Sequence, residues 1–199
     1  MTPISIYIAS EDLLSEAIAT RLAEMNGFVV GHTFRKQGFG YLKANVENWN
    51  RLAAGNPVLL LTDLDATECP MSLIEAWLPN GLHKNMLLRV AVREVESWLI
   101  ADHAAITKFL KAPPSSVSAN PDELRNPKAA LIELARRHAP ANIRSRIVPP
   151  NWSSAQQGPD YNACLIEYVQ GVWDPHRAAE RSNSLYRMMI RLREFEPIW

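Results

Sequence analysis

The chain has 199 residues, of which 47% are hydrophobic and 21% are charged, and this ordinary globular composition excludes wholesale disorder. The 21 Lys and Arg balance the 21 Asp and Glu, so the net charge of zero excludes an overall positive field that recruits nucleic acid. Two cysteines, the lack of a signal-peptide pattern and the lack of a long apolar stretch together predict a cytoplasmic protein outside the membrane.

The first half of the chain alternates between strand and helix patterns. Short runs rich in Ile, Val and Leu predict four strands, over residues 4–9, 28–34, 57–63 and 86–92. Helical patterns lie in the intervals, after Ser10 as an N-cap, over 42–54 behind a glycine-marked loop at 37–40, and over 71–78. The third run is apolar on both faces, as in the central strand of a parallel sheet. The order predicts an α/β fold with a small parallel sheet and flanking helices.

The second half of the chain carries helical patterns and no further strand pattern. Two short helices are expected on either side of Asp102, which suits the cap of the second. Longer helices are predicted over residues 127–138, 161–171 and 176–195. The proline-rich loop at 112–121 is too short to serve as a linker. We therefore predict a single domain over residues 1–199, with a sheet core at 1–93 and a helical extension at 94–199 packed on it.

Acidic residues follow the first and third predicted strands. Glu11 follows the first strand, and Asp63 and Asp65 follow the third. Ligands of open parallel sheets bind beyond the carboxyl ends of the strands, and clustered carboxylates are typical of a site for a hard divalent cation. If strand geometry continues past Asp63, the side chains of Asp63 and Asp65 point the same way and can share one ion. The pattern predicts a metal site of Glu11, Asp63 and Asp65.

The same carboxylates also have a structural interpretation. Glu11 and Asp12 suit the first turn of the following helix, where negative charge offsets the helix dipole. Asp63 suits the cap of a loop. The sequence leaves this alternative open beside the metal site.

Charged residues also follow the fourth predicted strand. Arg93, Glu94 and Glu96 are candidates for an additional site, in which Arg93 neutralises the carboxylates or clamps a phosphate. A buried ion pair of Arg93 with Glu96 or Asp65 is the structural alternative.

Several separated blocks of the sequence share one motif pattern. Residues 92–102 have the sequence VREVESWLIAD, and further blocks lie at 161–162, at 173–179 and at 182–185. The first block resembles the R-E-x-E-x-W-L-x-A-D signature of a bacterial Toprim-like family of unknown function, and the other blocks resemble it too. Glu11 and the Asp-x-Asp at 63–65 resemble the Toprim domain itself, the metal-binding module of topoisomerases, primases and overcoming-lysogenization-defect nucleases.

The resemblance implies a Toprim- or Rossmann-like sheet and a phosphodiester chemistry. It gives Glu11 the role of general acid/base or further ligand, and Asp63 and Asp65 the role of the pair that holds Mg²⁺ or Mn²⁺. It implies a Mg²⁺-dependent nuclease or a related phosphodiester-processing protein that acts on nucleic acid. It also implies a role in bacterial defence against phage or other mobile DNA, commonly beside an ATPase partner. Glu94 and Glu96 belong to the signature without an assigned role.

Two departures from the Toprim pattern keep a non-enzymatic function open. Asp12 stands where the pattern has glycine, and Ser15 stands where it has an acid, with Glu16 one position later. With the zero net charge, these departures favour the alternative of a non-catalytic Toprim-fold partner subunit in an ATPase-containing defence complex. A receiver-like phosphotransfer domain fits less well, because no suitable lysine follows a later strand. The sequence leaves open whether the protein is an enzyme.

Arginines recur along the last predicted helix. Four of them fall within an arc of about 120° on a helix over 176–195, namely Arg177, Arg181, Arg187 and Arg191. Such a stripe suits contacts with a phosphate backbone. The alternative, which the sequence favours, is a solvated helix face paired with Glu180 and Glu194.

Overall fold

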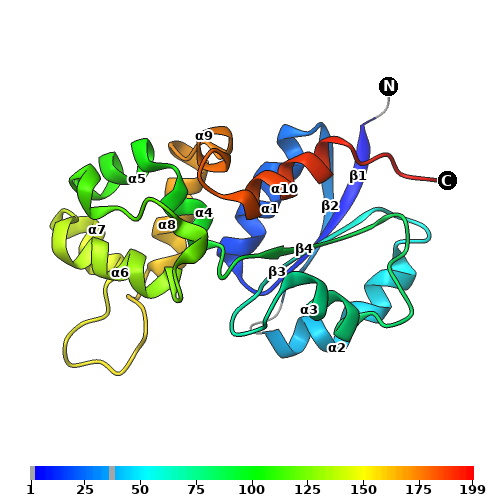
Figure 1. The fold of residues 1–199 in the computed structure, drawn as a ribbon, viewed down its shortest axis with the longest axis horizontal. Coiled ribbons are helices and arrows are strands. Elements are labelled where there is room, and N and C mark those ends of the chain that lie inside the picture. The colour runs from blue at the N-terminus through cyan, green and yellow to red at the C-terminus, as the bar shows by residue number, and fades with distance from the viewer. Residues whose placement is uncertain (1–2, 36–38) are drawn as a thin grey trace. The chain divides into compact units, whose positions relative to one another are not determined.

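The chain forms two compact units in a computed structural model that describes residues 3–35 and 39–199. The first unit contains residues 1–92 together with 187–199, and the second contains residues 93–186. The boundary at 92/93 lies next to the predicted boundary between the sheet core and the helical extension at 93/94. The packing of the extension on the sheet as a single domain stays a prediction. Figure 1 labels the elements of both units.

The first unit is built on a four-stranded parallel sheet, which confirms the predicted α/β class. The strands lie in the order β2-β1-β3-β4, and their bounds are β1 Ile4–Ser10, β2 Phe28–Arg35, β3 Val58–Asp63 and β4 Met86–Ala91. Strand β3 has a neighbour on each side, and its residues from Val58 to Thr62 are all buried. The continuous apolar run therefore marks a central strand, as predicted.

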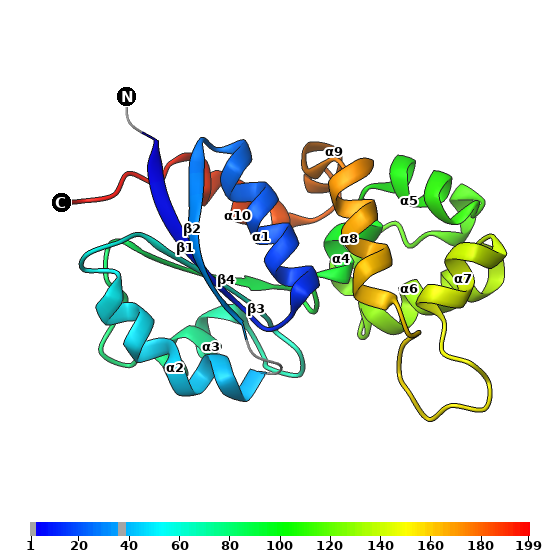
Figure 2. The same cartoon turned by 180° about the vertical axis from the view of Figure 1, so that it is seen from behind.

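Helices cover both faces of this sheet. They are α1 Leu13–Met25, α2 Phe39–Leu52, α3 Pro70–Trp77 and the part of α10 Asn183–Arg193 that belongs to the first unit. Helices α1 and α10 lie on one side of the sheet, and α2 and α3 lie on the other (Figures 1 and 2). On the second side, Leu60 and Leu88 pack in one cluster with Trp49 of α2 and Trp77 of α3.

Two predicted helix starts in the first unit are wrong. Helix α1 is capped by Asp12, not by Ser10, because the Asp12 carboxylate accepts a hydrogen bond from the Ser15 backbone N–H at 2.8 Å. Ser10 is instead the fully buried last residue of β1. Helix α2 begins at Phe39 rather than at 42. Residues 37 and 38 of the predicted loop lie outside the described residues.

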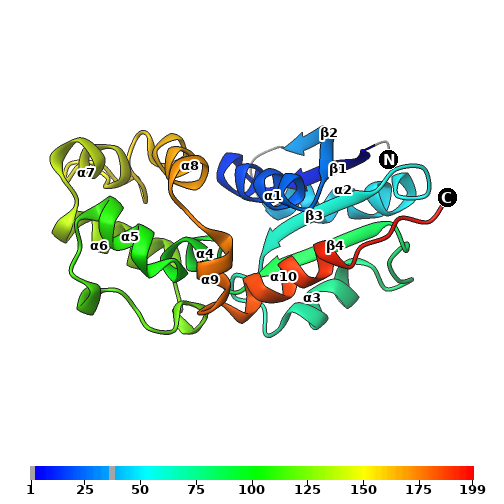
Figure 3. The ribbon, with the colours of Figure 1, turned by 90° about the horizontal axis from the view of Figure 1, so that it is seen from above.

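The second unit is helical. Its elements are α4 Glu96–Ala101, α5 His103–Leu110, α6 Pro127–His138, α7 Ala141–Ile147, α8 Tyr161–Gly171 and α9 Pro175–Ala179, with short 3₁₀ turns at Pro114–Ser116 and Pro121–Glu123. Every residue of α4 is buried, and α4 contacts α5, α6 and α9 (Figure 3). Asp102 caps α5 as predicted, through a hydrogen bond from the Ala105 N–H. Helix α7 has no counterpart among the predicted elements. Within the described residues, no helix has the length and apolar character that a membrane span needs.

The single helix predicted over 176–195 is wrong, because the chain forms α9 and α10 there with a break around Ser182. The Ser182 hydroxyl accepts a hydrogen bond from the Leu185 N–H and donates one to Asp122. A buried serine with these bonds starts a new helix rather than continuing the old one. The arginines at 177, 181, 187 and 191 therefore do not form a stripe on one helix.

Candidate functional site

The structure holds Glu11 at the carboxyl end of the neighbouring strand β3. The Thr62 hydroxyl donates a hydrogen bond to Glu11 Oε1 at 2.5 Å, and the Asp63 backbone N–H donates one to the same oxygen at 3.1 Å. Strands β1 and β3 are parallel neighbours, so the residues that follow them meet at one edge of the sheet. Glu11 and Asp63 thus lie together at the edge where the sequence predicts a site.

The Glu11 carboxyl lies in a mixed electrostatic environment. Its burial raises the pKa of Glu11 above the ordinary value, and the negative charges of Asp65 and Asp12 raise it as well. The hydrogen bonds from Thr62 and Asp63 act in the opposite direction, because they stabilise the ionised form. The net effect is a carboxyl that takes up a proton more readily than an exposed glutamate does.

The expected strand geometry through Asp65 is wrong. Strand β3 ends at Asp63, Leu64 is buried, and Asp65 is exposed with a left-handed backbone at a φ of 48°. The Thr67 N–H donates a hydrogen bond to the Leu64 carbonyl at 3.0 Å, so the chain turns there. The two-residue alternation therefore does not align the side chains of Asp63 and Asp65. Aspartate tolerates this backbone conformation better than most residues.

The charged side chains at this edge of the sheet are carboxylates, the kind of ligand that Mg²⁺ takes. Among residues 3–35 and 39–199, no group of three or more His, Cys, Asp and Glu side chains is arranged to hold a metal ion. Mg²⁺ usually binds one or two carboxylates and keeps waters or substrate phosphates as its other ligands. Glu11 Oε2 accepts no hydrogen bond from a described residue, and the charge of Asp65 acts on Glu11. The chemistry of these side chains is therefore that of ligands for such an ion, and its binding here stays a prediction.

Thr62 is a site residue that the sequence analysis missed. It positions the Glu11 carboxylate from a strand position 51 residues away. A polar residue next to three leucines in a buried strand is a signal of such a role, because a buried hydroxyl needs a hydrogen-bond partner.

The candidates for an additional site, Arg93, Glu94 and Glu96, belong to the second unit. Glu94 Oε2 accepts a hydrogen bond from the Lys128 backbone N–H at 2.8 Å, at the start of α6. Glu96 is buried, and its Oε1 accepts a hydrogen bond from the Tyr161 hydroxyl at 2.8 Å. Glu94 and Glu96 thus bind elements of their own unit.

Burial increases the proton affinity of Glu96 and raises its pKa to about 7. The charge of Lys128 and the hydrogen bond from Tyr161 lower this pKa, whereas the negative charge of Glu94 raises it. The Lys128 Nζ atom lies 4.9 Å from the centre of the Tyr161 ring, close to this buried pair. The group is a compact part of the core around α4.

Helix α4 and Asp102 bind the other blocks of the motif pattern. The Trp98 indole N–H donates to the Ser184 hydroxyl at 3.1 Å, and the Trp173 indole N–H donates to the Trp98 carbonyl at 3.1 Å. Arg177 donates to both carboxylate oxygens of Asp102, through Nε at 3.0 Å and Nη2 at 2.8 Å. The four blocks on which the resemblance rests therefore meet in the core of the second unit, and their structural role is to hold it together.

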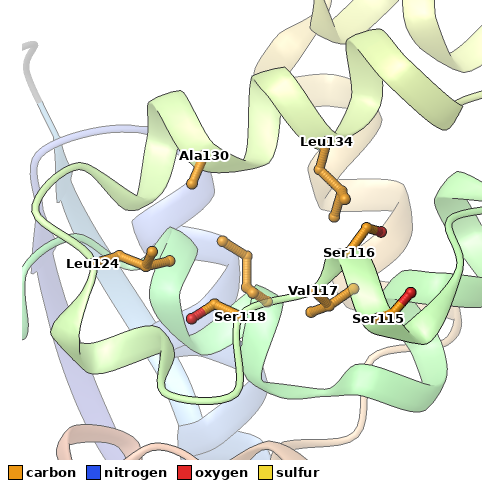
Figure 4. Close-up of a pocket in the computed structure, with 8 residues that line it drawn as sticks. Ser115, Ser116, Val117, Ser118, Leu124, Ala130 and Leu134 are labelled. Atoms are coloured by element: carbon orange, nitrogen blue, oxygen red, sulfur yellow. The ribbon is translucent and has the colours of Figure 1, made fainter.

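A cavity of about 260 Å³ lies in the second unit (Figure 4). Its lining combines apolar residues with small hydroxyls, from Ile100, Ser115, Ser116, Val117, Ser118, Leu124, Ala130 and Leu134. None of these lining residues carries a charge, a nucleophilic thiol or an imidazole. The cavity therefore offers no acid/base or metal chemistry.

Comparisons of the chain with protein-family models, with curated proteins and with solved structures found no match. The assignment of a function therefore depends on the sheet edge at Glu11, Asp63 and Asp65 and on the motif resemblance.

Proposed function

We propose that the protein is a Mg²⁺-dependent nuclease or a related phosphodiester-processing enzyme whose site is formed by Glu11, Asp63 and Asp65. The observation that carries the proposal is the hydrogen bonding of Glu11 to Thr62 and Asp63, since it joins the acid after β1 to the Asp-x-Asp segment after β3. The acids occupy the ligand-binding edge of a parallel sheet, and their order along the chain is that of a Toprim site.

The residues of this edge have separate tasks in the proposed reaction. Glu11 and Asp65 would hold the ion, and Mg²⁺ would supply positive charge next to the phosphate oxygens of a substrate. The alternative task of Glu11 is to accept and release a proton at its carboxylate, in which case it would not also ligate the ion. Thr62 and the Asp63 N–H keep the carboxylate in place through their bonds to Oε1.

The proposal includes the setting that the motif resemblance implies. The enzyme acts on nucleic acid in the bacterial cytoplasm, in defence against phage or other mobile DNA, with an ATPase as partner.

Metal binding by Glu11 is testable through the stability of the protein. Mg²⁺ or Mn²⁺ is expected to raise the melting temperature of the wild-type protein. When the ion concentration exceeds its Kd a hundredfold, binding increases the free energy of unfolding by about 2.7 kcal/mol. Glu11→Gln is expected to lose this gain, because an amide is a poor metal ligand, while its carbonyl oxygen still accepts the bonds from Thr62 and Asp63. The metal-free variant should be at least as stable as the wild type, since a partly buried carboxylate beside Asp65 and Asp12 is removed.

The same variants test the reaction. Cleavage of single-stranded, duplex and supercoiled DNA and of RNA is expected to fall by about a hundredfold or more in Glu11→Gln and to fall in Asp65→Asn. Glu24→Gln, an exposed acid near the end of α1, is the matched control and should behave as the wild type. A wild-type protein without metal-dependent stabilisation, or Glu11→Gln with full stabilisation, would contradict the proposal.

A second candidate function is a non-catalytic subunit of an ATPase-containing complex. The observation that favours it is the structural use of several acids: Asp12 caps α1, and Asp102 binds Arg177 in the core of the second unit. Metal-dependent stabilisation without cleavage of any nucleic acid, alone and with the ATPase, would decide for this candidate.

A further inference from the structure

Three arginines of the first unit gather around β4 and α10. Arg89 lies in β4 between Leu88 and Val90, which point toward α2 and α3. Because strand side chains alternate, Arg89 points to the opposite face, where α10 lies (Figure 2). Arg187 and Arg191 are exposed and stand one turn apart on α10, and their charges act on Arg89.

Helix α10 is anchored to the sheet, so this arrangement is built into the fold. Met188 and Leu192 are buried on its inner face. The segment that follows is held by two hydrogen bonds between Asn85 and the Ile198 backbone, both at 2.8 Å. Arg187 and Arg191 are therefore presented on a fixed surface beside Arg89.

Within residues 3–35 and 39–199, no acidic side chain pairs with this cluster. Among the residues that the structure describes, none forms an ion pair with Arg89, Arg187 or Arg191. The Arg89 Nε atom is buried and has no hydrogen-bond partner there. Burial, together with the charges of Arg191 and Arg187, lowers the pKa of Arg89 from its ordinary high value. A buried N–H without a partner and repulsion between like charges both cost free energy, and an anion bound beside the three guanidinium groups would remove the repulsion.

The register of the sheet places this cluster close to the acidic edge. Arg89 pairs with Leu61, and Asp63 pairs with Ala91. Asp63 of β3 is thus two residues closer to the carboxyl edge of the sheet than Arg89 of the neighbouring strand β4, an offset of about 7 Å in the strand direction. The two residues lie on the same face of the sheet. A chain of phosphates that contacts the arginines can extend to the edge where Glu11 and Asp63 meet.

We propose that Arg89, Arg187 and Arg191 bind a phosphate of a nucleic-acid backbone next to the acidic edge of the sheet. This assignment rests on the proposed function, since it takes the substrate to be a nucleic acid. Guanidinium groups suit the role, because they donate paired hydrogen bonds to phosphate oxygens and stay charged. The open position of Arg187 and Arg191 on α10 admits a long polymer as well as a single phosphate group.

Binding of labelled single-stranded and duplex oligonucleotides in EDTA tests this site without the metal. The double variant Arg187→Gln/Arg191→Gln is expected to weaken binding by about tenfold or more, and the slope of log K against log salt should fall by about one for each phosphate that the variant no longer neutralises.

Arg89→Met should weaken binding too, while its melting temperature without ligand stays equal to or above that of the wild type, since the buried unpartnered N–H is gone. Arg193→Gln, an exposed arginine on the same helix, is the matched control and should bind as the wild type.

The outcomes separate this inference from the proposed function. Arginine-dependent binding in EDTA without any cleavage in Mg²⁺ would support the phosphate site and overturn the nuclease. Metal-dependent cleavage that the arginine variants leave unchanged would overturn the phosphate site alone. Equal weakening by Arg193→Gln would overturn it as well, because only general charge would then matter. Stabilisation by inorganic phosphate without oligonucleotide binding would overturn the nucleic-acid assignment.

Discussion

Replacing Asp102 by Ala is expected to lower the free energy of unfolding by about 3 kcal/mol or more. The Asp102 side chain is fully buried and accepts four hydrogen bonds, from the Nε and Nη2 atoms of Arg177 and from the backbone N–H groups of Ala105 and Asp174. Removal of the carboxylate leaves two backbone donors without this partner and separates α9 from the cap of α5. The expected effect stands near the lower end of the range for buried ion pairs, because Arg177 itself reaches solvent.

The urea midpoint measures this effect, with circular dichroism as the readout. Asp160→Ala is the matched control, because Asp160 is an exposed aspartate of the same unit whose contact with Arg146 is long, at 3.7 Å. The control is expected to leave the midpoint where it is. Arg177→Met should also destabilise, since it leaves the Asp102 charge buried. Equal midpoints for Asp102→Ala and Asp160→Ala would show that the Asp102 network does not hold the second unit together.

Glu96 is expected to make the protein less stable as the pH rises from about 4.5 to about 7. Burial raises the pKa of Glu96 in the folded state to about 7 from an ordinary value of 4.5, so the folded protein binds the proton more tightly than the unfolded chain does. Stability from this group is therefore fully present below pH 4.5 and is lost as the pH passes through 7. The decrease is on the order of 3 kcal/mol, since a tenfold difference in proton affinity between the two states corresponds to about 1.4 kcal/mol.

Glu96→Gln isolates this effect, because the amide has nearly the same volume and its carbonyl oxygen still accepts the bond from the Tyr161 hydroxyl. The stability of the variant minus that of the wild type is expected to grow between pH 4.5 and 7 and to stay constant above pH 7. Glu123→Gln, an exposed glutamate of the same unit, should show no such difference. Urea titrations at a series of pH values measure it. A flat difference for Glu96→Gln would mean that the Glu96 carboxylate ionises as easily in the folded protein as in the unfolded chain.

The candidate site was predictable only in part. The placement of Glu11 and Asp63 at one edge follows from strand order, because parallel strands end together. The alignment of Asp65 with Asp63 did not hold, because the backbone turns at Leu64. Whether the edge binds a metal stays a prediction, as does the role of Glu94 and Glu96 in function.

Local sequence by itself determined most of the elements. The apolar run that forms β3 can be buried on both faces only inside a sheet, and Asn126 with Pro127 starts α6 where it was predicted, through a cap that involves neighbouring residues alone. Asp102 was a predictable cap for the same reason, since its bond to Ala105 spans three residues.

Only the tertiary structure decided which distant side chains meet. The Thr62 hydroxyl binds Glu11 from 51 residues away, Arg177 reaches Asp102 across 75 residues, and the bond between Ser182 and Asp122 divides what sequence periodicity presents as one helix. Arg89 meets the arginines of α10 only because the chain returns to the sheet after residue 186. Periodicity reports which face of an element is apolar, whereas hydrogen bonds and charges act through space between elements that the fold brings together.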